Sequence, residues 1–268
     1  MMPEFTNKSA FITGAARGQG RATAIALARE GADILAFDLG CKIEYPAYAC
    51  EACGELESLK GEIEALGRKC VIATGDVRDD EAVRAAAEAA MRAFGRIDIL
   101  FNNAGICAYA EVDKMTDTEM DAMIDINLKG PMIVARHVVP IMKKQNSGVI
   151  INNSSVMGLR GGRRLSHYAA SKWGLTGLTK SWAIELAPWN IRVVSIHPTG
   201  VNTPMNDGLA ALEGKTPTEI AEASAGNLQP VPWIESEDVA EMVLYLAGDK
   251  ARFITGGQFV LDAGLLSV

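Results

Sequence analysis

The stretch SAFITGAARGQG, residues 9–20, decides the fold. It opens with a short apolar run, continues with glycines spaced Gly-x3-Gly-x-Gly, and is followed by a helical pattern over residues 21–30. A strand, a glycine-rich turn and a helix N-terminus in this order can cradle a pyrophosphate, because glycines allow close approach of the backbone and the helix end offers unpaired N–H groups. The spacing differs from the GxGxxG form of this motif, but the required strand and helix flank it. The residues expected to form this cofactor cradle are Gly14, Arg17, Gly18, Gln19 and Gly20.

Short apolar runs alternate with helix-length segments along the whole chain. This alternation is typical of a parallel sheet covered by helices on both faces. The expected strands are 8–13, 33–38, 69–75, 97–101, 148–153, 191–197 and 257–261. The expected helices are 18–30, 55–67, 79–94, 117–143, 167–187 and 236–247, with short helices possible between 204 and 226. We therefore predict an α/β protein in which residues 1–268 form one Rossmann-like, doubly wound domain with a seven-stranded parallel sheet.

The composition narrows the class of protein. A chain of 268 residues with 49% hydrophobic content can bury one large core. Its net charge of −7 argues against nucleic-acid or anionic-membrane partners. The sequence has neither a signal-peptide pattern nor an apolar run long enough to span a membrane. Its five cysteines do not resemble a disulfide scaffold, so a reducing, cytoplasmic location is the expectation.

Three residues have the chemistry needed to move a proton at a carbonyl or alcohol oxygen. Tyr168 and Lys172 are four residues apart in an expected helix, which places them on one face, and Ser155 precedes the tyrosine by thirteen residues. A nearby ammonium favours the ionised phenol, so we expect Lys172 to lower the pKa of Tyr168. Ser155 follows a strand and can hydrogen-bond the same substrate oxygen. The adjacent Ser154 is the competing candidate.

Asp38, at the end of the second expected strand, is the candidate for choosing the cofactor. A carboxylate at this position can accept hydrogen bonds from both ribose hydroxyls and repels a 2′-phosphate. Arg17 favours NADP(H) instead, since a guanidinium in the glycine turn can bind a phosphate. It can also pair with Asp38 or face solvent. The balance favours NAD(H) over NADP(H).

Together with Asn103-Ala104-Gly105 and Asn127, these motifs make the chain resemble the short-chain dehydrogenase/reductase family from about Lys8 to Gly264. The resemblance implies that Asn127 holds a water linking the lysine to solvent, and that Lys172 grips the nicotinamide ribose. It also implies cofactor contacts from residues beyond the glycine turn. These are Asp76 at the adenine amino group, Val77 at the adenine ring, Asn103, Ala104 and Gly105 beside the cofactor, and Pro198, Gly200, Val201 and Thr203 near the nicotinamide and pyrophosphate.

The resemblance implies hydride transfer that interconverts a secondary alcohol and a ketone. Residues 202–235 are expected to form a substrate lid, and an apolar set near the cleft favours a bulky substrate such as a hydroxysteroid, bile acid or cyclic terpenoid alcohol. That candidate set comprises Cys107, Met157, Met205 and Trp233, with Tyr109, Arg160 and Trp173 as wider possibilities. The alternatives are a 3-oxoacyl thioester reductase and a non-catalytic NAD(H)-binding sensor or scaffold.

Other features are less specific. Residues 39–54 lengthen the connection after the second strand, and an insertion here resembles a subgroup that holds its nicotinamide cofactor tightly. Its three cysteines, with Cys70 as the only nearby fourth, are interpreted as unrelated thiols, and no metal is expected. Arg160, Arg163 and Arg164 can meet an acidic substrate tail or face solvent. No catalytic role is assigned to His137, His167 or His197, and a homo-oligomer through helices 117–143 and 167–187 is expected.

Overall fold

The computed structural model describes residues 3–40, 45–46, 54–224 and 226–267. Its seven strands form one sheet in which every neighbouring pair is parallel, in the order β3-β2-β1-β4-β5-β6-β7. The strands are β1 (Ser9–Thr13), β2 (Asp33–Asp38), β3 (Cys70–Thr74), β4 (Ile99–Asn102), β5 (Gly148–Asn153), β6 (Ile191–Pro198) and β7 (Gln258–Leu261). The order reverses between β1 and β4, and a crevice opens at the carboxyl ends of strands where such a reversal occurs.

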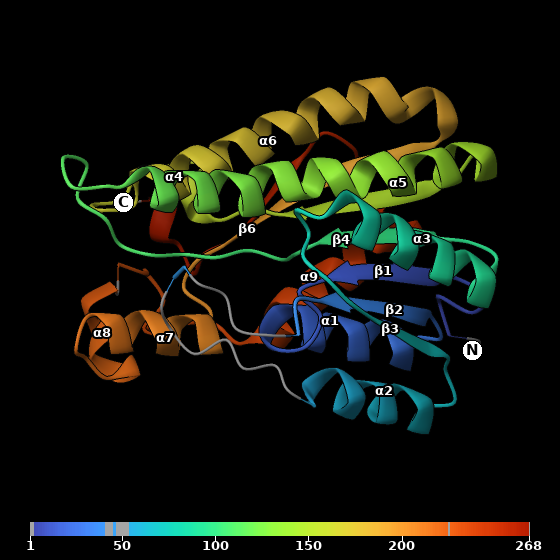
Figure 1. Ribbon diagram of the computed structural model, residues 1–268, viewed down its shortest axis with the longest axis horizontal. Helices are drawn as coiled ribbons and strands as arrows, with labels where there is room; N and C mark the ends of the chain where they lie inside the picture. The colour runs from blue at the N-terminus through green and yellow to red at the C-terminus, as the bar shows by residue number, and fades with distance from the viewer. Residues whose placement is uncertain (1–2, 41–44, 47–53, 225, 268) are drawn as a thin grey trace.

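Helices cover both faces of the sheet (Figure 1). On one face lie α1 (Gly18–Arg29), α2 (Glu55–Ala65) and α9 (Ser236–Ala247), which share a buried core with residues of β1, β2 and β4. On the other lie α3 (Asp80–Phe94), α5 (Gly130–Gln145) and α6 (Ser166–Leu186), with a separate core. Central strands buried on both sides explain the apolar runs in the sequence. The predicted α/β class, with its doubly wound sheet, is confirmed.

Two short helices, α7 (Pro204–Leu212) and α8 (Pro217–Ser224), stand apart from these layers at the left of Figure 1. They fall in the interval where short helices were expected. Because they follow β6, they lie at the end of the sheet where the carboxyl ends of the strands meet.

The predicted helix 117–143 differs from the structure. It is divided into α4 (Asp117–Ile124), a π-helical segment (Asp125–Lys129) and α5. Asn127 lies inside the π-helical segment with its side chain buried and bonded to other parts of the chain. Those side-chain bonds are made across the fold, so a periodicity along one segment cannot reveal them.

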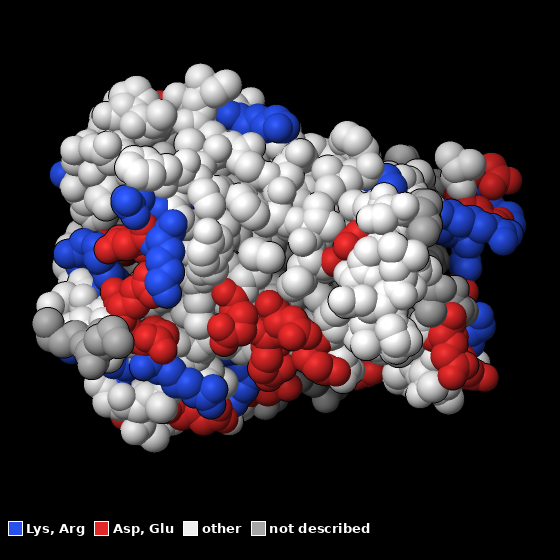
Figure 2. Space-filling view, turned by 180° about the vertical axis from the view of Figure 1, so that it is seen from behind, with Lys and Arg blue, Asp and Glu red and all other residues white. Residues whose placement is uncertain are grey.

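In the part of the chain that the structure describes, each helix is too short or too polar to cross a membrane. On the face shown in Figure 2, Lys and Arg side chains stand in separate groups interleaved with Asp and Glu.

Candidate active site

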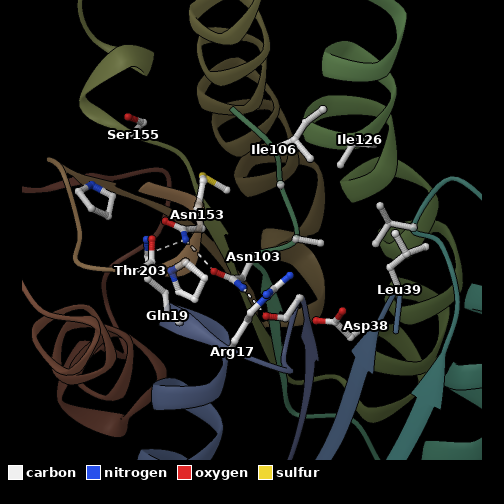
Figure 3. Close-up of a pocket in the computed structure, with 18 of the residues that line it drawn as sticks. Arg17, Gln19, Asp38, Leu39, Asn103, Ile106, Ile126, Asn153, Ser155 and Thr203 are labelled. Carbon is white, nitrogen blue, oxygen red and sulfur yellow. Dashed lines mark hydrogen bonds between the residues drawn. The ribbon is translucent and has the colours of Figure 1, made fainter. Parts of the chain in front are cut away.

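A pocket lies at the carboxyl ends of the strands and collects residues from Gly14 to Met205 (Figure 3). Most of the predicted cofactor and catalytic residues line it. They are Gly14, Arg17, Gly18, Gln19, Asp38, Asp76, Val77, Asn103, Ala104, Gly105, Ser155, Tyr168, Lys172, Pro198 and Thr203. The candidate substrate residue Met205 also lines it. Gly20, Asn127, Gly200 and Val201 are absent from the lining and lie behind it.

The glycine turn needs glycine for two different reasons. Gly14 and Gly18 have φ values of +65° and +53°, in the region that favours glycine. At Gly20 a Cβ would lie 2.1 Å from the carbonyl oxygen of Gly14, so a side chain cannot fit. Helix α1 begins at Gly18 without a side-chain cap, which leaves its first N–H groups facing the pocket end of the turn. These features fit a bound pyrophosphate.

A hydrogen-bonded network ties the glycine turn to the catalytic side of the pocket. The Asn153 side chain donates to Gln19 Oε1 at 2.8 Å and to Asn103 Oδ1 at 2.9 Å (Figure 3). Asn103 in turn donates to the main-chain oxygens of Thr13 and Gly14, each at 3.0 Å. Asn153 was not predicted as a site residue. Two consecutive asparagines at the end of an apolar strand were the available signal, because buried polar side chains need partners.

Asp38 and Arg17 lie in the pocket but do not pair with each other. Asp38 Oδ2 accepts a hydrogen bond from the Ala16 N–H at 3.0 Å, which fixes the carboxylate beside the turn. Arg17 instead approaches Glu55 of α2, with Nε 3.9 Å from Oε2. Glu55 is thus a fourth possibility for Arg17, besides a phosphate, Asp38 and solvent, and it draws the guanidinium towards α2.

Asp76 and Val77 follow β3 at the same edge. Burial acts to raise the pKa of Asp76, but hydrogen bonds from Arg78 outweigh it and leave that pKa lowered. Arg78 donates to both carboxylate oxygens, with Nη2 2.6 Å from Oδ2. The carboxylate is therefore ionised and held in place at the pocket.

Tyr168 and Lys172 stand one turn apart on α6, with Lys172 Nζ 5.5 Å from the centre of the tyrosine ring. Burial raises the pKa of Tyr168, and a side-chain hydrogen bond with Ser155 acts in the lowering direction. Burial also lowers the pKa of Lys172 to about 8. The expected lowering of the tyrosine pKa by the lysine is therefore not seen in the chain alone, because desolvation of both groups dominates.

The two adjacent serines face opposite ways. The Ser154 hydroxyl donates to the Lys172 main-chain oxygen at 3.1 Å and lies in contact with Thr176, so it is directed into α6. The Ser155 hydroxyl accepts from the Met157 N–H at 3.1 Å at the start of a 3₁₀ turn (Val156–Gly158). Ser155 and Tyr168 thus lie together at one end of the pocket.

His197 has hydrogen-bond partners that the sequence did not reveal. It is fully buried, its Nδ1 lies 2.8 Å from the Ser155 main-chain oxygen, and its Nε2 lies 2.9 Å from Ser195 Oγ. A carbonyl only accepts, so Nδ1 carries the hydrogen and the neutral ring accepts from Ser195. His137 also has a partner, Asp80, at 2.9 Å.

Asn127 supports the site from behind. Its Oδ1 accepts from the Ile106 N–H at 2.8 Å, and its Nδ2 donates to the Ile106 carbonyl at 2.9 Å and towards Ser171 Oγ at 3.3 Å. Lys172 Nζ donates to the Asn153 main-chain oxygen at 2.8 Å. Asn127 is 1% exposed, so its side chain lies in the interior of the protein and not on a solvated helix face.

The segment after β6 closes the pocket on its remaining side. A Cβ at Gly200 would lie 2.3 Å from the Trp233 ring, so this glycine is required by close packing. The Val201 carbonyl accepts from the Asn206 side chain at 2.5 Å and from the Thr203 hydroxyl at 3.3 Å. Thr203 lies next to Gly18, since a Cβ at Gly18 would be 3.2 Å from Thr203 Cγ2, and both residues line the pocket at the glycine turn.

The candidate substrate residues separate into groups. Cys107 and Met205 pack with Tyr168 in a small apolar cluster that we call the apolar wall; its members are Cys107, Tyr109, Leu165, Tyr168, Met205 and Leu209. Trp233 lies against Gly200, and Met157 lies beside Gly162. Trp173 is 51% exposed and Arg160 is also exposed. Cys41, Cys50 and Cys53 lie outside the described residues.

Sequence reasoning missed several further pocket residues. They are Phe37, Leu39, Gly75, Ile106, Ile126, Asn153, Thr199 and Pro204; Ser154, the competing candidate to Ser155, also lines the pocket. Most adjoin a predicted residue at a strand end, so proximity to the motifs was the one available signal.

Comparison with known proteins agrees with this geometry. Residues 8–213 match the family model described as short chain dehydrogenase. The chain is 41% identical to a (−)-trans-carveol dehydrogenase of Rhodococcus erythropolis, over 98% of this chain and 99% of the relative. It is 38% identical to a 3-oxoacyl-[acyl-carrier-protein] reductase of Thermotoga maritima, over 97% and 98%.

Among solved structures, it resembles carveol dehydrogenase from Mycobacterium avium in complex with NAD, with a TM-score of 0.95, 38% identity and coverage of 99% of this chain and 100% of that one. The matches extend over the glycine turn, the strand-end motifs and the Ser155, Tyr168 and Lys172 region alike. The chain therefore belongs to the short-chain dehydrogenase family.

Proposed function

We propose that this protein is an NAD-dependent oxidoreductase that interconverts a cyclic, apolar secondary alcohol and its ketone. The observation that carries the proposal is the meeting of Ser155, Tyr168 and Lys172 at one end of a pocket whose other end has Asp38 beside the glycine turn. The similarity to carveol dehydrogenases supports a cyclic terpenoid alcohol as the substrate class. The proposed substrate class also includes hydroxysteroids and bile acids.

The residues of the pocket fit a dinucleotide. Gly14, Gly18 and the open end of α1 would hold the pyrophosphate, and Asp38 would accept hydrogen bonds from the adenosine ribose. Lys172 would hold the nicotinamide ribose. The nicotinamide, when bound, supplies or accepts the hydride.

The protein itself manages the proton. In alcohol oxidation Tyr168 accepts the hydroxyl proton, and in ketone reduction it returns a proton to the oxygen. Ser155 holds the same oxygen by a hydrogen bond, an electrostatic contribution of about 3 kcal/mol for one well-placed donor. Because burial raises the pKa of Tyr168 in the chain alone, a positive charge close by is needed to favour the phenolate, and Lys172 is the nearest cation on α6.

Cofactor choice follows from the carboxylate of Asp38, which repels a 2′-phosphate. Arg17 is drawn towards Glu55 and away from Asp38, which weakens its claim as a phosphate ligand. Both observations support NAD(H) over NADP(H).

The cofactor is proposed to exchange slowly. Leu39, the first residue of the insertion, lines the pocket, and the Tyr45 hydroxyl lies 3.4 Å from His167 Nε2 on α6. This contact joins the segment after β2 to the residue that precedes Tyr168. These two contacts, of Leu39 with the pocket and of Tyr45 with His167, support slow exchange of the cofactor.

Self-association is proposed through α5 and α6, which run side by side in Figure 1. Met132 on α5 and Trp173 and Ile184 on α6 are 45%, 51% and 80% exposed, and such apolar side chains favour an interface. Size-exclusion chromatography with light scattering would measure the stoichiometry.

The test begins with protein purified without dialysis. Its absorbance and fluorescence report bound NAD(H), and turnover is then followed at the NADH absorbance band with NAD+ and NADP+ in parallel on carveol and other cyclic alcohols. Oxidation of these alcohols with NAD+, or through an external electron acceptor if the cofactor stays bound, supports the proposal. Failure on every alcohol and ketone by both routes contradicts it.

The second candidate is reduction of a 3-oxoacyl thioester, favoured by the similarity to the Thermotoga maritima reductase. Activity on a carrier-bound 3-oxoacyl thioester, with none on free cyclic ketones, would select it.

A further inference from the structure

An ion pair joins the end of α7 to the loop before α6. Arg164 Nη1 lies 2.8 Å from Glu213 Oε2, and Nη2 lies 3.1 Å from Oε1, so the guanidinium and carboxylate meet in a two-point contact. The side chains are only 35% and 23% exposed. Such a partly buried, two-point pair is more specific in geometry than a single surface contact.

The pair is attached to the apolar wall beside Tyr168. The Arg164 guanidinium lies over the Tyr109 ring, 5.4 Å from its centre, and the next residue, Leu165, belongs to the wall. Glu213 directly follows α7. Two residues of α7 belong to the wall, Leu209 and Met205, and Met205 also lines the pocket. The Arg164 main-chain oxygen accepts from the Ala110 N–H at 2.9 Å, which holds this loop against the other side of the wall.

The charged residues around Arg164 differ in whether they contact the apolar wall. Glu213 neutralises Arg164, whose guanidinium lies over the Tyr109 ring of the wall. A second cation beside the wall, Lys172, lies 5.5 Å from the centre of the Tyr168 ring and donates to the Asn153 main-chain oxygen. Glu111 adds a further negative charge near Arg164 but is itself paired with Lys114. The neighbouring Arg163 is exposed, and no contact draws it to the wall. Beside Arg164 the wall therefore presents apolar side chains and a guanidinium already paired with Glu213, so an anionic group gains no free guanidinium there.

We propose that Glu213 determines substrate specificity by occupying Arg164, so that neutral alcohols are accepted and alcohols carrying a carboxylate are rejected. This inference rests on the proposed function. Removal of the Glu213 carboxylate would leave Arg164 unpaired at the rim of the wall. A substrate carboxylate could then pair with Arg164 in place of Glu213.

The experiment compares two substrates that differ in one group, 3-methylcyclohexanol and 3-hydroxycyclohexanecarboxylate. In Glu213→Ala, the ratio of kcat/KM for the anionic over the neutral alcohol should rise about tenfold or more, the value of one charge-assisted hydrogen bond. The double variant Glu213→Ala with Arg164→Gln should lose that gain. Glu111→Gln and Arg163→Gln, which alter nearby charges outside the pair, should leave the ratio unchanged.

A binding measurement separates this inference from the proposed function. Calorimetric titration with cyclohexanecarboxylate should show tighter binding to Glu213→Ala than to the wild type, whether or not either protein turns over an alcohol. Equal binding to both, in a variant whose thermal unfolding remains cooperative, overturns the specificity role. If cyclohexanecarboxylate binds Glu213→Ala more tightly but the wild type oxidises no alcohol, the role of Glu213 is supported and the proposed reaction is contradicted.

Discussion

The His197 ring donates from Nδ1 to the main-chain oxygen of Ser155 at 2.8 Å, joining the ends of β6 and β5 in the interior of the protein. The two residues are 42 positions apart. This bond places the proposed catalytic serine through its backbone, while the serine hydroxyl stays available to a substrate. His197 is thus a positioning residue.

Replacing His197 by Leu should reduce both stability and turnover. The substitution leaves the Ser155 carbonyl and the Ser195 hydroxyl without their partner, at a cost of about 2 kcal/mol in free energy of unfolding. Displacement of Ser155 should lower kcat about tenfold with a smaller change in KM. Urea unfolding and steady-state kinetics provide the measurements. Ser195→Ala is the control, because it removes only the hydrogen bond remote from Ser155; a His197→Leu enzyme with undiminished kcat would refute the positioning role.

Lys172 should make stability depend on pH in the alkaline range. Burial lowers its pKa in the folded chain to about 8 from 10.5, so between these values the unfolded chain holds a proton that the folded chain has released. The free energy of unfolding of the wild type should therefore rise with pH across this window relative to Lys172→Met, by up to about 3 kcal/mol. Chemical denaturation at several pH values measures it, and parallel pH profiles for the two proteins would contradict it. The variant should also lose turnover.

Asp38→Asn should shift the cofactor preference. The amide keeps an oxygen that can accept from the Ala16 N–H but loses the charge that repels a 2′-phosphate. We expect the ratio of kcat/KM for NADP+ over NAD+ to rise about tenfold, corresponding to about 1.4 kcal/mol. Adding Arg17→Ala tests whether this arginine contributes to that gain. A ratio unaltered by Asp38→Asn would show that another group selects the cofactor.

Asn153→Val should weaken cofactor binding more than chemistry. The change removes the hydrogen bonds to Gln19 and Asn103 that hold the glycine turn, while the main-chain oxygen that accepts from Lys172 remains. KM for NAD+ should rise about fivefold, equivalent to roughly 1 kcal/mol, with kcat little changed. Gln19→Leu should have a smaller effect of the same kind, as it removes one of the two bonds. A loss confined to kcat would instead assign Asn153 to catalysis.

Tyr168→Phe should abolish turnover while NADH binding survives. The substitution removes only the hydroxyl that exchanges the proton, and the ring can still pack with the apolar wall. Fluorescence titration with NADH measures binding, and the kinetic assay measures the loss. Retained turnover would exclude Tyr168 as the proton donor.

Much of the fold could be predicted because its causes are local. The apolar runs that became the inner strands β1, β2, β4, β5 and β6 are buried on both faces, and buried parallel strands leave a continuous hydrophobic signal. The single helix expected over 117–143 failed at the π-helical segment, where Asn127 bonds to Ile106 from another part of the chain. The lowered pKa expected for Tyr168 failed for a related reason, because the spacing showed the lysine but not the burial of both groups.

By itself, the sequence determined the order of strands and helices, the glycine turn and the spacing of Ser155, Tyr168 and Lys172, since these depend on backbone conformation and periodicity along a short stretch. The tertiary structure decided which polar groups meet: His197 with Ser155, Asn153 with Gln19, and Arg164 with Glu213. Such pairs form between residues far apart in the chain, and only the folded packing brings donor and acceptor within hydrogen-bond distance and removes the water that would otherwise satisfy them.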